Sequence, residues 1–365
     1  MSAPHLVIAA GGTGGHMFPA QALAQEMLRR GWRVSLTTDD RGARYAGGFP
    51  EAVARVPVRS ATFARGGALA KLAAPALIGM GVLETLRWFR RDPPSVVAGF
   101  GGYPSLPALS AAVLSGRPRL IHEQNGVLGR VNRVFAPRVA LVACGTWPLT
   151  NAPAGVDARH VGNPIRDAAR ALAGAPYAAP ADGPLNLLVF GGSQGASALS
   201  RLVPEAVAAL PQDLRARLRL TQQAREGEAE GLSRAYADLG VPAEVAPFFS
   251  DMPQRIAEAQ LVACRAGAST VAELTAIGRP SILIPYPHAM DDHQTANARP
   301  LAEAGAAIAA QEAGLTAQAL SAHIASVLGD PTRAAAMAAA AAALGRPDAA
   351  ERLADLAAAT AEQVA

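Results

Sequence analysis

Short continuous runs of hydrophobic residues recur along the chain and are separated by longer stretches with helical spacing. Runs of this length bounded by turn residues are typical of buried strands, and continuous hydrophobicity indicates parallel strands covered on both faces. The pattern predicts strands at residues 5–9, 33–37, 95–99, 119–123, 139–144, 185–190, 217–221, 261–264 and 281–285. Strands that alternate with helices predict an α/β fold of doubly wound parallel sheets.

Two of these strands open into the same kind of sequence. HLVIAAGGTGGH (5–16) and LNLLVFGGSQGA (185–196) each run from an apolar strand through a glycine-rich turn into a helix, as a Rossmann-like unit begins. The chain has 365 residues, more than the roughly 250 at which a single hydrophobic core stops growing. We therefore expect two Rossmann-like doubly wound domains facing a cleft.

A break between the domains is expected near Asn163, because the GNP sequence at 162–164 and the Ala/Pro/Gly-rich segment 172–184 disfavour regular structure. The alanine-rich tail favours two helices, separated by Gly-Arg-Pro at 345–347. The predicted domains are residues 1–163, with a last helix at about 346–365 that packs back on them, and residues 164–345.

Composition narrows the class of protein. Half of the residues are hydrophobic and 17% are charged, which indicates packed interiors rather than disorder. The net charge of +4 is carried almost wholly by arginine, since Lys71 is the only lysine. This surplus is compatible with acidic or phosphorylated partners but too small to indicate nucleic acid, so no nucleic-acid partner is expected.

Cys144 and Cys264 each end an apolar LVAC run without a metal-ligand neighbour, so buried free thiols in a reducing compartment are expected. The N-terminus has no basic region typical of a signal peptide. The most apolar long stretch, residues 68–89, contains Lys71, Pro75 and Glu84 and is not expected to span a membrane.

Three glycine-rich turns follow predicted strands: 11–15, 99–102 and 191–195. Glycine lets the backbone approach a ligand, and a following helix offers free N–H groups to an anion. The first helix is expected to start near Pro19, and Ser193 with Gln194 would suit a diphosphate at the third turn. Tight turns without a ligand are the alternative.

A dinucleotide site is a second interpretation of the first turn. Asp39 and Asp40 follow the second predicted strand, where a carboxylate would contact the ribose of NAD. However, Met17 stands where the G-x-G-x-x-G pattern requires its third glycine. An NAD-dependent oxidoreductase therefore stays as the alternative enzyme class.

Three polar clusters also follow strands. HEQNG (122–126) would face the crevice or supply turn and cap residues. In CRAGASTVAEL (264–274) a helix is expected to start at Ser269 or Thr270, so that Glu273 either forms a capping box or accepts two ribose hydroxyls. DDHQTANA (291–298) suits sugar hydroxyls better than a metal, because its acidic residues and His293 are adjacent.

GGTGGH, GGY, HEQN, GNPIR, GGSQGA, RAGASTVAE and DDHQTANA occur in this order over nearly the whole chain. This series resembles the MurG family of peptidoglycan N-acetylglucosaminyltransferases, which have the two-domain glycosyltransferase-B fold. The resemblance implies inverting transfer of N-acetylglucosamine from UDP-GlcNAc to the muramoyl sugar of undecaprenyl-diphospho-MurNAc-pentapeptide (lipid I to lipid II), without a cofactor or metal. A related glycosyltransferase-B enzyme with another acceptor is the second hypothesis.

The same resemblance implies a place and a set of contacts. The enzyme would serve cell wall biogenesis, cell shape and cell division as a peripheral protein on the cytoplasmic face of the bacterial inner membrane. The donor would lie mainly on the second domain, with its phosphates near Arg166 and Ser193, uracil at Phe249, ribose at Glu273 and sugar at Asn125 and Gln294. The implied substrate-binding residues are Thr13, Gly14, Gly15, Asn125, Arg166, Ser193, Phe249, Ala268, Ser269, Thr270, Val271, Ala272, Glu273 and Gln294.

Inverting transfer needs a base that takes the proton of the acceptor hydroxyl. His16 is the first candidate, because histidine titrates near neutrality, and Glu123 is the second. Alternatively, His16 orders its loop or binds a phosphate. Arg166 and the backbone amides around Ser193 would stabilise the departing UDP in place of a metal.

A lipid-linked acceptor requires contact with a membrane. Segment 65–91 mixes large apolar residues with Arg65, Lys71, Arg87, Arg90 and Arg91, a pattern suited to an anionic leaflet. Its apolar residues are Leu69, Leu72, Leu77, Ile78, Met80, Leu83, Leu86, Trp88 and Phe89. The alternative is an ordinary amphipathic helix packed on the sheet.

Overall fold

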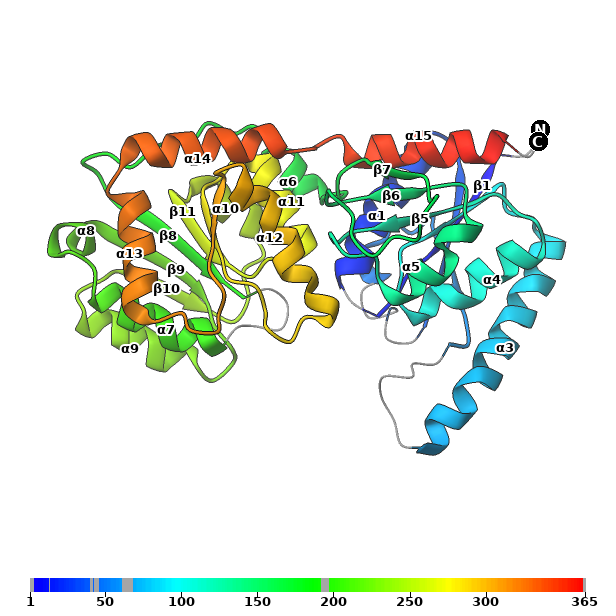
Figure 1. The fold of residues 1–365 in the computed structure, drawn as a ribbon, viewed down its shortest axis with the longest axis horizontal. Coiled ribbons are helices and arrows are strands. Elements are labelled where there is room, and N and C mark those ends of the chain that lie inside the picture. Colours follow the sequence, from blue (N-terminus) through cyan, green and yellow to red (C-terminus); the bar gives the residue numbers. More distant parts are fainter. Residues whose placement is uncertain are drawn as a thin grey trace. The chain divides into compact units, whose positions relative to one another are not determined.

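The computed structural model describes residues 3–12, 14–39, 42, 46–60, 68–191 and 197–363, except the side chains of residues 46 and 68–72. The chain forms two compact units. Unit 1 comprises Met1–Arg166 and Pro347–Ala365, and unit 2 comprises Asp167–Arg346. Figure 1 shows helices on both faces of the sheet in each unit.

Unit 1 is built on a seven-stranded parallel sheet of order β3-β2-β1-β4-β5-β6-β7. Its strands are β1 (His5–Ala9), β2 (Arg33–Thr38), β3 (Ala54–Pro57), β4 (Val96–Gly99), β5 (Arg119–Glu123), β6 (Val142–Cys144) and β7 (Ala158–His160). Its helices include α1 (Gly14–Arg29), α3 (Ala68–Arg91), α4 (Leu106–Leu114), α5 (Arg130–Phe135), the short η3 (Ala136–Arg138) and α15 (Ala349–Glu362).

The hydrophobic run of β1 shows why this sheet is covered on both faces. Successive side chains of a strand point to opposite faces. Leu6 and Ile8 pack into a core with α1 and α15, whereas Val7 and Ala9 pack into a second core with α3, α4 and α5. The continuous apolar pattern therefore reflects two separate interiors.

Unit 2 has a six-stranded parallel sheet of order β10-β9-β8-β11-β12-β13. Its strands are β8 (Leu185–Phe190), β9 (Leu218–Gln223), β10 (Ala243–Ala246), β11 (Leu261–Cys264), β12 (Ser281–Leu283) and β13 (Ala307–Ala309). Its helices include α6 (Asp167–Arg170), α7 (Ser197–Ala208), α8 (Gln212–Arg217), α9 (Ala229–Asp238), α10 (Met252–Glu258), α11 (Ala268–Ile277), α12 (His293–Glu303), α13 (Ala317–Leu328) and α14 (Pro331–Leu344).

Each of the nine predicted strands is present, and the expectation of two Rossmann-like parallel sheets is confirmed. Both cysteines are buried and unpaired, as expected.

The predicted start of the first helix is wrong: α1 begins at Gly14, inside the glycine turn, and Pro19 lies within the helix. Because Pro19 lacks an N–H, the carbonyl of Gly15 loses its helical donor, and Gly15 is exposed to water.

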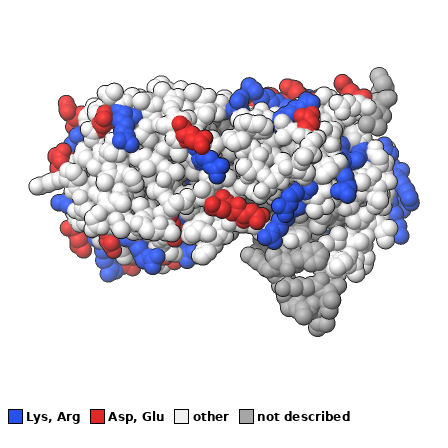
Figure 2. Space-filling view, viewed as in Figure 1, with Lys and Arg blue, Asp and Glu red and all other residues white. Residues whose placement is uncertain are grey.

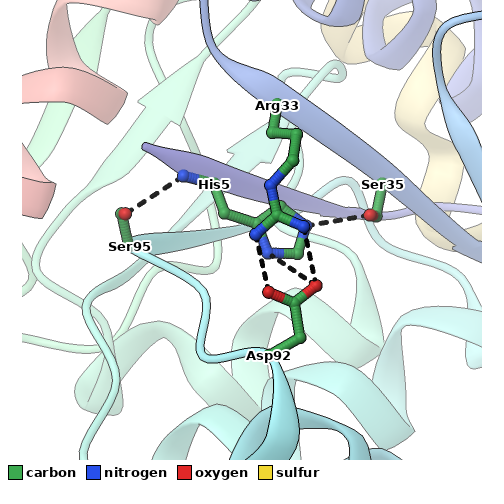
Figure 3. Close-up of polar contacts among 5 residues, drawn as sticks. All are labelled: His5, Arg33, Ser35, Asp92 and Ser95. Carbon is green, nitrogen blue, oxygen red and sulfur yellow. Dashed lines mark hydrogen bonds and ion pairs between the residues drawn. The ribbon is translucent and has the colours of Figure 1, made fainter. Parts of the chain in front are cut away.

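The end of α3 is tied to the sheet by a polar cluster (Figure 3). Asp92 follows the helix and accepts two hydrogen bonds from Arg33 at the start of β2, at 2.9 and 2.6 Å. The buried ring of His5 lies 3.6 Å from Asp92 and 2.8 Å from the Ser35 hydroxyl, and burial lowers its pKa. The cluster fixes the C-terminal end of α3 against the first residues of β1 and β2.

Candidate active site

In open α/β sheets a ligand crevice is expected where the chain leaves two neighbouring strands toward opposite edges, and β1 and β4 of unit 1 are such a pair. The chain leaves β1 toward one edge of the sheet and β4 toward the other, so the loops after these neighbouring strands separate at their carboxyl ends. Directly after the strands, before they diverge, the two loops still lie close together: a Cβ on Gly102 would lie 2.8 Å from the Gly11 carbonyl oxygen. Gly101 and Gly102 have φ of +86° and +75°, a conformation that favours glycine.

The first turn of α1 lies at this crevice. Gly14 is buried, Gly15 is exposed and His16 is partly exposed, while Thr13 lies outside the described residues. A Cβ on Gly101 would lie 3.4 Å from His16 Cδ2 and 3.2 Å from Asn132 Nδ2, so His16 and Asn132 flank the same glycine. The two glycine loops thus bring His16 beside residues that follow β5.

Glu123, at the carboxyl end of β5, is 2% exposed and accepts four hydrogen bonds. Its Oε1 accepts from the backbone and side-chain nitrogens of Asn125, both at 3.1 Å. Its Oε2 accepts from the Gly129 backbone and from Asn132 Nδ2, both at 2.9 Å. Burial raises the pKa of Glu123, and these hydrogen bonds oppose the rise. This geometry favours a positioning role for Glu123 over that of a general base.

The remaining HEQN residues are also held in place. Gln124 donates to the Phe100 carbonyl at 2.8 Å, which joins this loop to the one after β4. His122 is fully buried, with its ring 5.3 Å from that of Phe100 and its Nε2 3.3 Å from the Gly162 carbonyl. Only Asn125 of the four is part-exposed, so it is the one able to meet a ligand.

The burial of His122 makes the stability of the fold sensitive to acid. Its pKa is lowered to about 4, against about 6.5 for an unfolded chain. Because the unfolded chain takes up the proton first, stability falls as the pH drops from about 6.5 to about 4. Between pH 7 and pH 4.5 we expect the free energy of unfolding of unit 1 to fall by about 2 kcal/mol more in the wild type than in His122→Phe, as measured by denaturant titration. Equal losses in the two proteins would contradict this.

Arg166 is the last residue of unit 1 and is partly exposed. Its guanidinium carbon lies 5.7 Å from the centre of the Phe18 ring on α1, a distance at which a cation is attracted to an aromatic face. Gly14 packs against the same ring, since a Cβ there would lie 3.0 Å from Phe18 Cε2. The structure therefore places Arg166 next to the first turns of α1.

Unit 2 repeats the arrangement at β8 and β11. The loop after β8 contains Ser193, which lies outside the described residues. The loop after β11 is clamped by α12: Gln294 Oε1 accepts from the backbone of Ala266 at 3.2 Å and of Tyr286 at 2.9 Å. Asn297 Nδ2 donates to the Ala266 carbonyl at 3.0 Å. Since the oxygen of Gln294 is used internally, its amino group remains as a donor for a ligand.

The segment 268–273 forms the first two turns of α11, with Gly267 as its N-cap. The predicted capping box is wrong, because the helix begins at Ala268 and Glu273 lies in the second turn. Ala268, Val271 and Glu273 are buried, whereas Ser269, Thr270 and Ala272 are partly exposed. The Ser269 hydroxyl oxygen is buried and has no hydrogen-bond partner in the described part of the chain. The free N–H groups of this helix start and that hydroxyl are suited to an anion or a nucleotide.

Phe249 and Phe248 differ in how far their rings are exposed to solvent. Phe249 is 7% exposed, and the Arg255 guanidinium carbon lies 4.2 Å from its ring centre. Arg255 is itself bound to Glu244 by two hydrogen bonds of 2.6 and 2.9 Å. Phe248 is 73% exposed. The ring of Phe249 is thus fixed from one side, and its neighbour is the accessible aromatic residue.

Sequence analysis missed Arg265, which directly precedes the clamped loop. Arg265 is 6% exposed, donates to the carbonyls of Ile284 and Pro285 at 3.1 and 3.2 Å, and pairs with Glu312 at 2.5 Å. It therefore holds together the segments that follow β11, β12 and β13. The arginine inside the CRAGAST motif was the signal, since a charge beside a buried strand needs a partner.

Two alternatives find little support in the described residues. Asp39 accepts a hydrogen bond from the Gly42 backbone at 2.9 Å and so takes part in a local turn, while Asp40 is not described. No group of three His, Cys, Asp or Glu residues in the described ranges could hold a metal ion.

Burial raises the pKa of Cys144 to about 12 and also raises that of Cys264, so both thiols stay protonated.

Comparison with known proteins gives consistent results. Residues 6–144 match the glycosyltransferase family 28 N-terminal domain and residues 186–353 match its C-terminal domain. A protein of Rhodospirillum centenum is 52% identical over 92% of this chain and 89% of its own length. One of Caulobacter vibrioides is 52% identical over 91% and 92%. Both are named UDP-N-acetylglucosamine–N-acetylmuramyl-(pentapeptide) pyrophosphoryl-undecaprenol N-acetylglucosamine transferase.

Solved structures extend the comparison to the fold. The crystal structure of Acinetobacter baumannii MurG has a TM-score of 0.80 and 32% identity, covering 97% of this chain and 99% of that one. A glycosyltransferase of kitacinnamycin, at 20% identity, has a TM-score of 0.69 over 99% and 100% of the two chains and shares the fold. From its two matched domains and its relatives, the chain belongs to glycosyltransferase family 28 and, within it, to the MurG N-acetylglucosaminyltransferases.

Proposed function

We propose that this chain moves N-acetylglucosamine from UDP-GlcNAc to the muramoyl sugar of undecaprenyl-diphospho-MurNAc-pentapeptide, with inversion, in peptidoglycan synthesis. The observation that carries the proposal is the clamped loop after β11. There, a helix start, a buried hydroxyl and a fixed side-chain amino group lie at the carboxyl edge of a Rossmann-like sheet. Relatives that are 52% identical over nine-tenths of the chain bear the name of this activity and support it.

Unit 2 would supply most of the donor contacts. Backbone amides at the start of α11 and the Ser269 hydroxyl would face the nucleotide, and Glu273 would accept the ribose hydroxyls. The diphosphate would lie at Ser193 and Arg166, where helix N-termini and a guanidinium stabilise the charge of departing UDP. The amino group of Gln294 would donate to a sugar hydroxyl.

Unit 1 would bind the acceptor and accept its proton. His16 is partly exposed at the crevice of the sheet, and the nearby Asn132 connects it to the loop held by Glu123. Asn125 would contact a sugar from that loop. We therefore propose His16 as the base and Glu123 as the residue that positions Asn125 and Asn132.

Helix α3 would attach the enzyme to the membrane that carries its acceptor, on the cytoplasmic face of the inner membrane. Leu77, Met80 and Leu83 are 39%, 41% and 54% exposed, and Arg90 and Arg91 are exposed at the end of the helix. No helix in the described ranges meets the length and hydropathy needed to cross a bilayer. Exposed apolar side chains bordered by arginine suit an anionic membrane surface.

Part of the predicted patch on segment 65–91 is wrong. Phe89 is 1% exposed in the core of unit 1, and Leu86 and Trp88 pack against that core. The helix turns these residues toward the sheet, as in an ordinary amphipathic helix. Arg65 lies outside the described residues, as do the side chains of Leu69, Lys71 and Leu72.

The decisive experiment is transfer of labelled N-acetylglucosamine from UDP to a lipid-linked muramoyl-pentapeptide. We expect the labelled disaccharide product without added metal. Thermal stabilisation by UDP without transfer to this acceptor would favour a related enzyme with another acceptor. Stabilisation by NAD and not by UDP would favour an oxidoreductase.

Gln294→Glu tests the donor contact. The carboxylate can still accept from Ala266 and Tyr286, but its second oxygen cannot donate to the sugar. We expect the KM for UDP-GlcNAc to rise about 10-fold or more, since a hydrogen bond of this kind contributes about 1.5 kcal/mol. Gln318→Glu, at an exposed residue of the same unit, is the matched control. An unchanged KM in Gln294→Glu would exclude donation to the sugar.

A further inference from the structure

A second pocket lies at the opposite end of unit 1 from the candidate active site. It has a volume of about 330 Å³ and is formed by the turn between α4 and β5, the segment from η3 to β6 and the end of α15. Its charged lining consists of Arg117, Arg119 and Arg138, and its described lining includes no Asp or Glu. Three guanidinium groups without a carboxylate create a positive potential inside a concave site.

Arg119 is held in place by backbone carbonyls, and no ion pair to it is found in the described part of the chain. Arg119 donates from Nε to the Arg138 carbonyl at 2.6 Å and from Nη1 to the Arg117 carbonyl at 2.7 Å. These bonds fix the plane of its guanidinium and leave Nη2 without a hydrogen bond in the described part of the chain. Burial lowers the pKa of Arg119, with no carboxylate to oppose the effect.

Arg117 contributes a buried donor. Its Nε is buried and has no hydrogen-bond partner among the described residues. Arg138, on the third side, donates from Nη1 to the Val134 carbonyl at 2.8 Å and is exposed. Because buried donors normally have partners, this orphaned nitrogen, on a residue that lines the same pocket as the fixed Arg119, indicates that a ligand with oxygen acceptors completes the site.

From this cluster we propose that the pocket of Arg117, Arg119 and Arg138 binds a phosphate group. Planar guanidinium groups match the oxygens of phosphate with paired hydrogen bonds. The pocket lies at the amino ends of the strands, because Arg119 is the first residue of β5. The end of α3 lies at the same edge, since Asp92 binds Arg33, the first residue of β2.

The surroundings of the pocket allow two sources of phosphate. Figure 2 shows Arg side chains gathered over the end of unit 1, near the C-terminal ends of α3 and α4. The phosphate could therefore belong to a lipid headgroup or be free in solution. The pocket and its chemistry do not depend on the proposed transferase activity.

The test uses the full chain and the double variant Arg117→Gln/Arg138→Gln, which leaves the internal bonds of the Arg119 side chain in place. Arg55→Gln/Arg159→Gln removes the same charge from exposed residues of unit 1 and is the control. Inorganic phosphate is titrated by calorimetry at low ionic strength, with UDP present to occupy the donor site. Melting temperatures establish that the variants are folded.

We expect phosphate affinity to fall about 10-fold or more in the Arg117/Arg138 variant and to be unchanged in the control. Vesicles of phosphatidylcholine with and without phosphatidylglycerol then distinguish the sources. Weaker vesicle binding by the Arg117/Arg138 variant alone assigns the phosphate to a lipid, and equal vesicle binding assigns it to a free phosphate. Equal phosphate affinity in wild type and this variant would overturn the site.

Discussion

His16→Ala should lower kcat by about 10²- to 10⁴-fold with both substrates saturating, the range that a positioned general base contributes. The acceptor hydroxyl would then have only water to take its proton. The wild-type kcat should also fall at acid pH, where a base is protonated, and this acid limb should be absent from the variant. Steady-state kinetics with the labelled donor between pH 5 and pH 9 measure both effects.

Two comparisons make this result specific. The KM for UDP-GlcNAc should change little in His16→Ala, because most of the proposed donor contacts are on unit 2 and His16 is not among them. His122→Phe removes a different histidine from the same unit and should keep the acid limb of kcat, since His122 is fully buried. A near-normal kcat in His16→Ala would remove His16 as the base and leave it with loop ordering or phosphate binding.

Glu123→Gln should lower kcat by about 10- to 100-fold while the acid limb of the pH profile stays in place. A carboxylate accepts four hydrogen bonds here, but a glutamine presents one acceptor oxygen and places an amino group against two donors. Each buried donor left without an acceptor costs about 1–3 kcal/mol. The loop that carries Asn125 and Asn132 should therefore lose its fixed geometry, without loss of a base.

Asn132→Ala supplies the matched comparison. If Glu123 acts through Asn132, the effects of Glu123→Gln and Asn132→Ala on kcat should be less than additive in the double variant, as expected for residues in one network. If Glu123 were the base, Glu123→Gln would be as severe as Glu123→Ala and the acid limb would disappear. That outcome would reverse the roles proposed for His16 and Glu123.

The interior of both sheets was predictable from the sequence, and their edges were not. Strands with neighbours on both sides are buried on two faces and appear as continuous apolar runs, such as β8. The four unpredicted strands, β3, β7, β10 and β13, are the edge strands of the two sheets. They are three or four residues long and partly exposed, so their composition does not distinguish them from loops.

The site shows a similar division. Glycine turns and polar clusters after strands predicted a candidate site at the carboxyl ends of the strands, because parallel strands carry these ends to one edge. The sequence could not tell that Glu123 would be surrounded by donors or that the oxygen of Gln294 would be used internally. Those facts depend on Asn132, on α5, and on Tyr286, in the loop after β12, which lie several residues away and have no signal of their own.

The position of α15 has a consequence for how the chain folds during synthesis. Leu353, Ala354 and Ala357 complete the core on the α1 face of unit 1, yet they emerge from the ribosome after every residue of unit 2. Unit 2 is continuous in sequence and can close its core first. One apolar face of the sheet of unit 1 therefore stays incompletely covered until α15 has been synthesised.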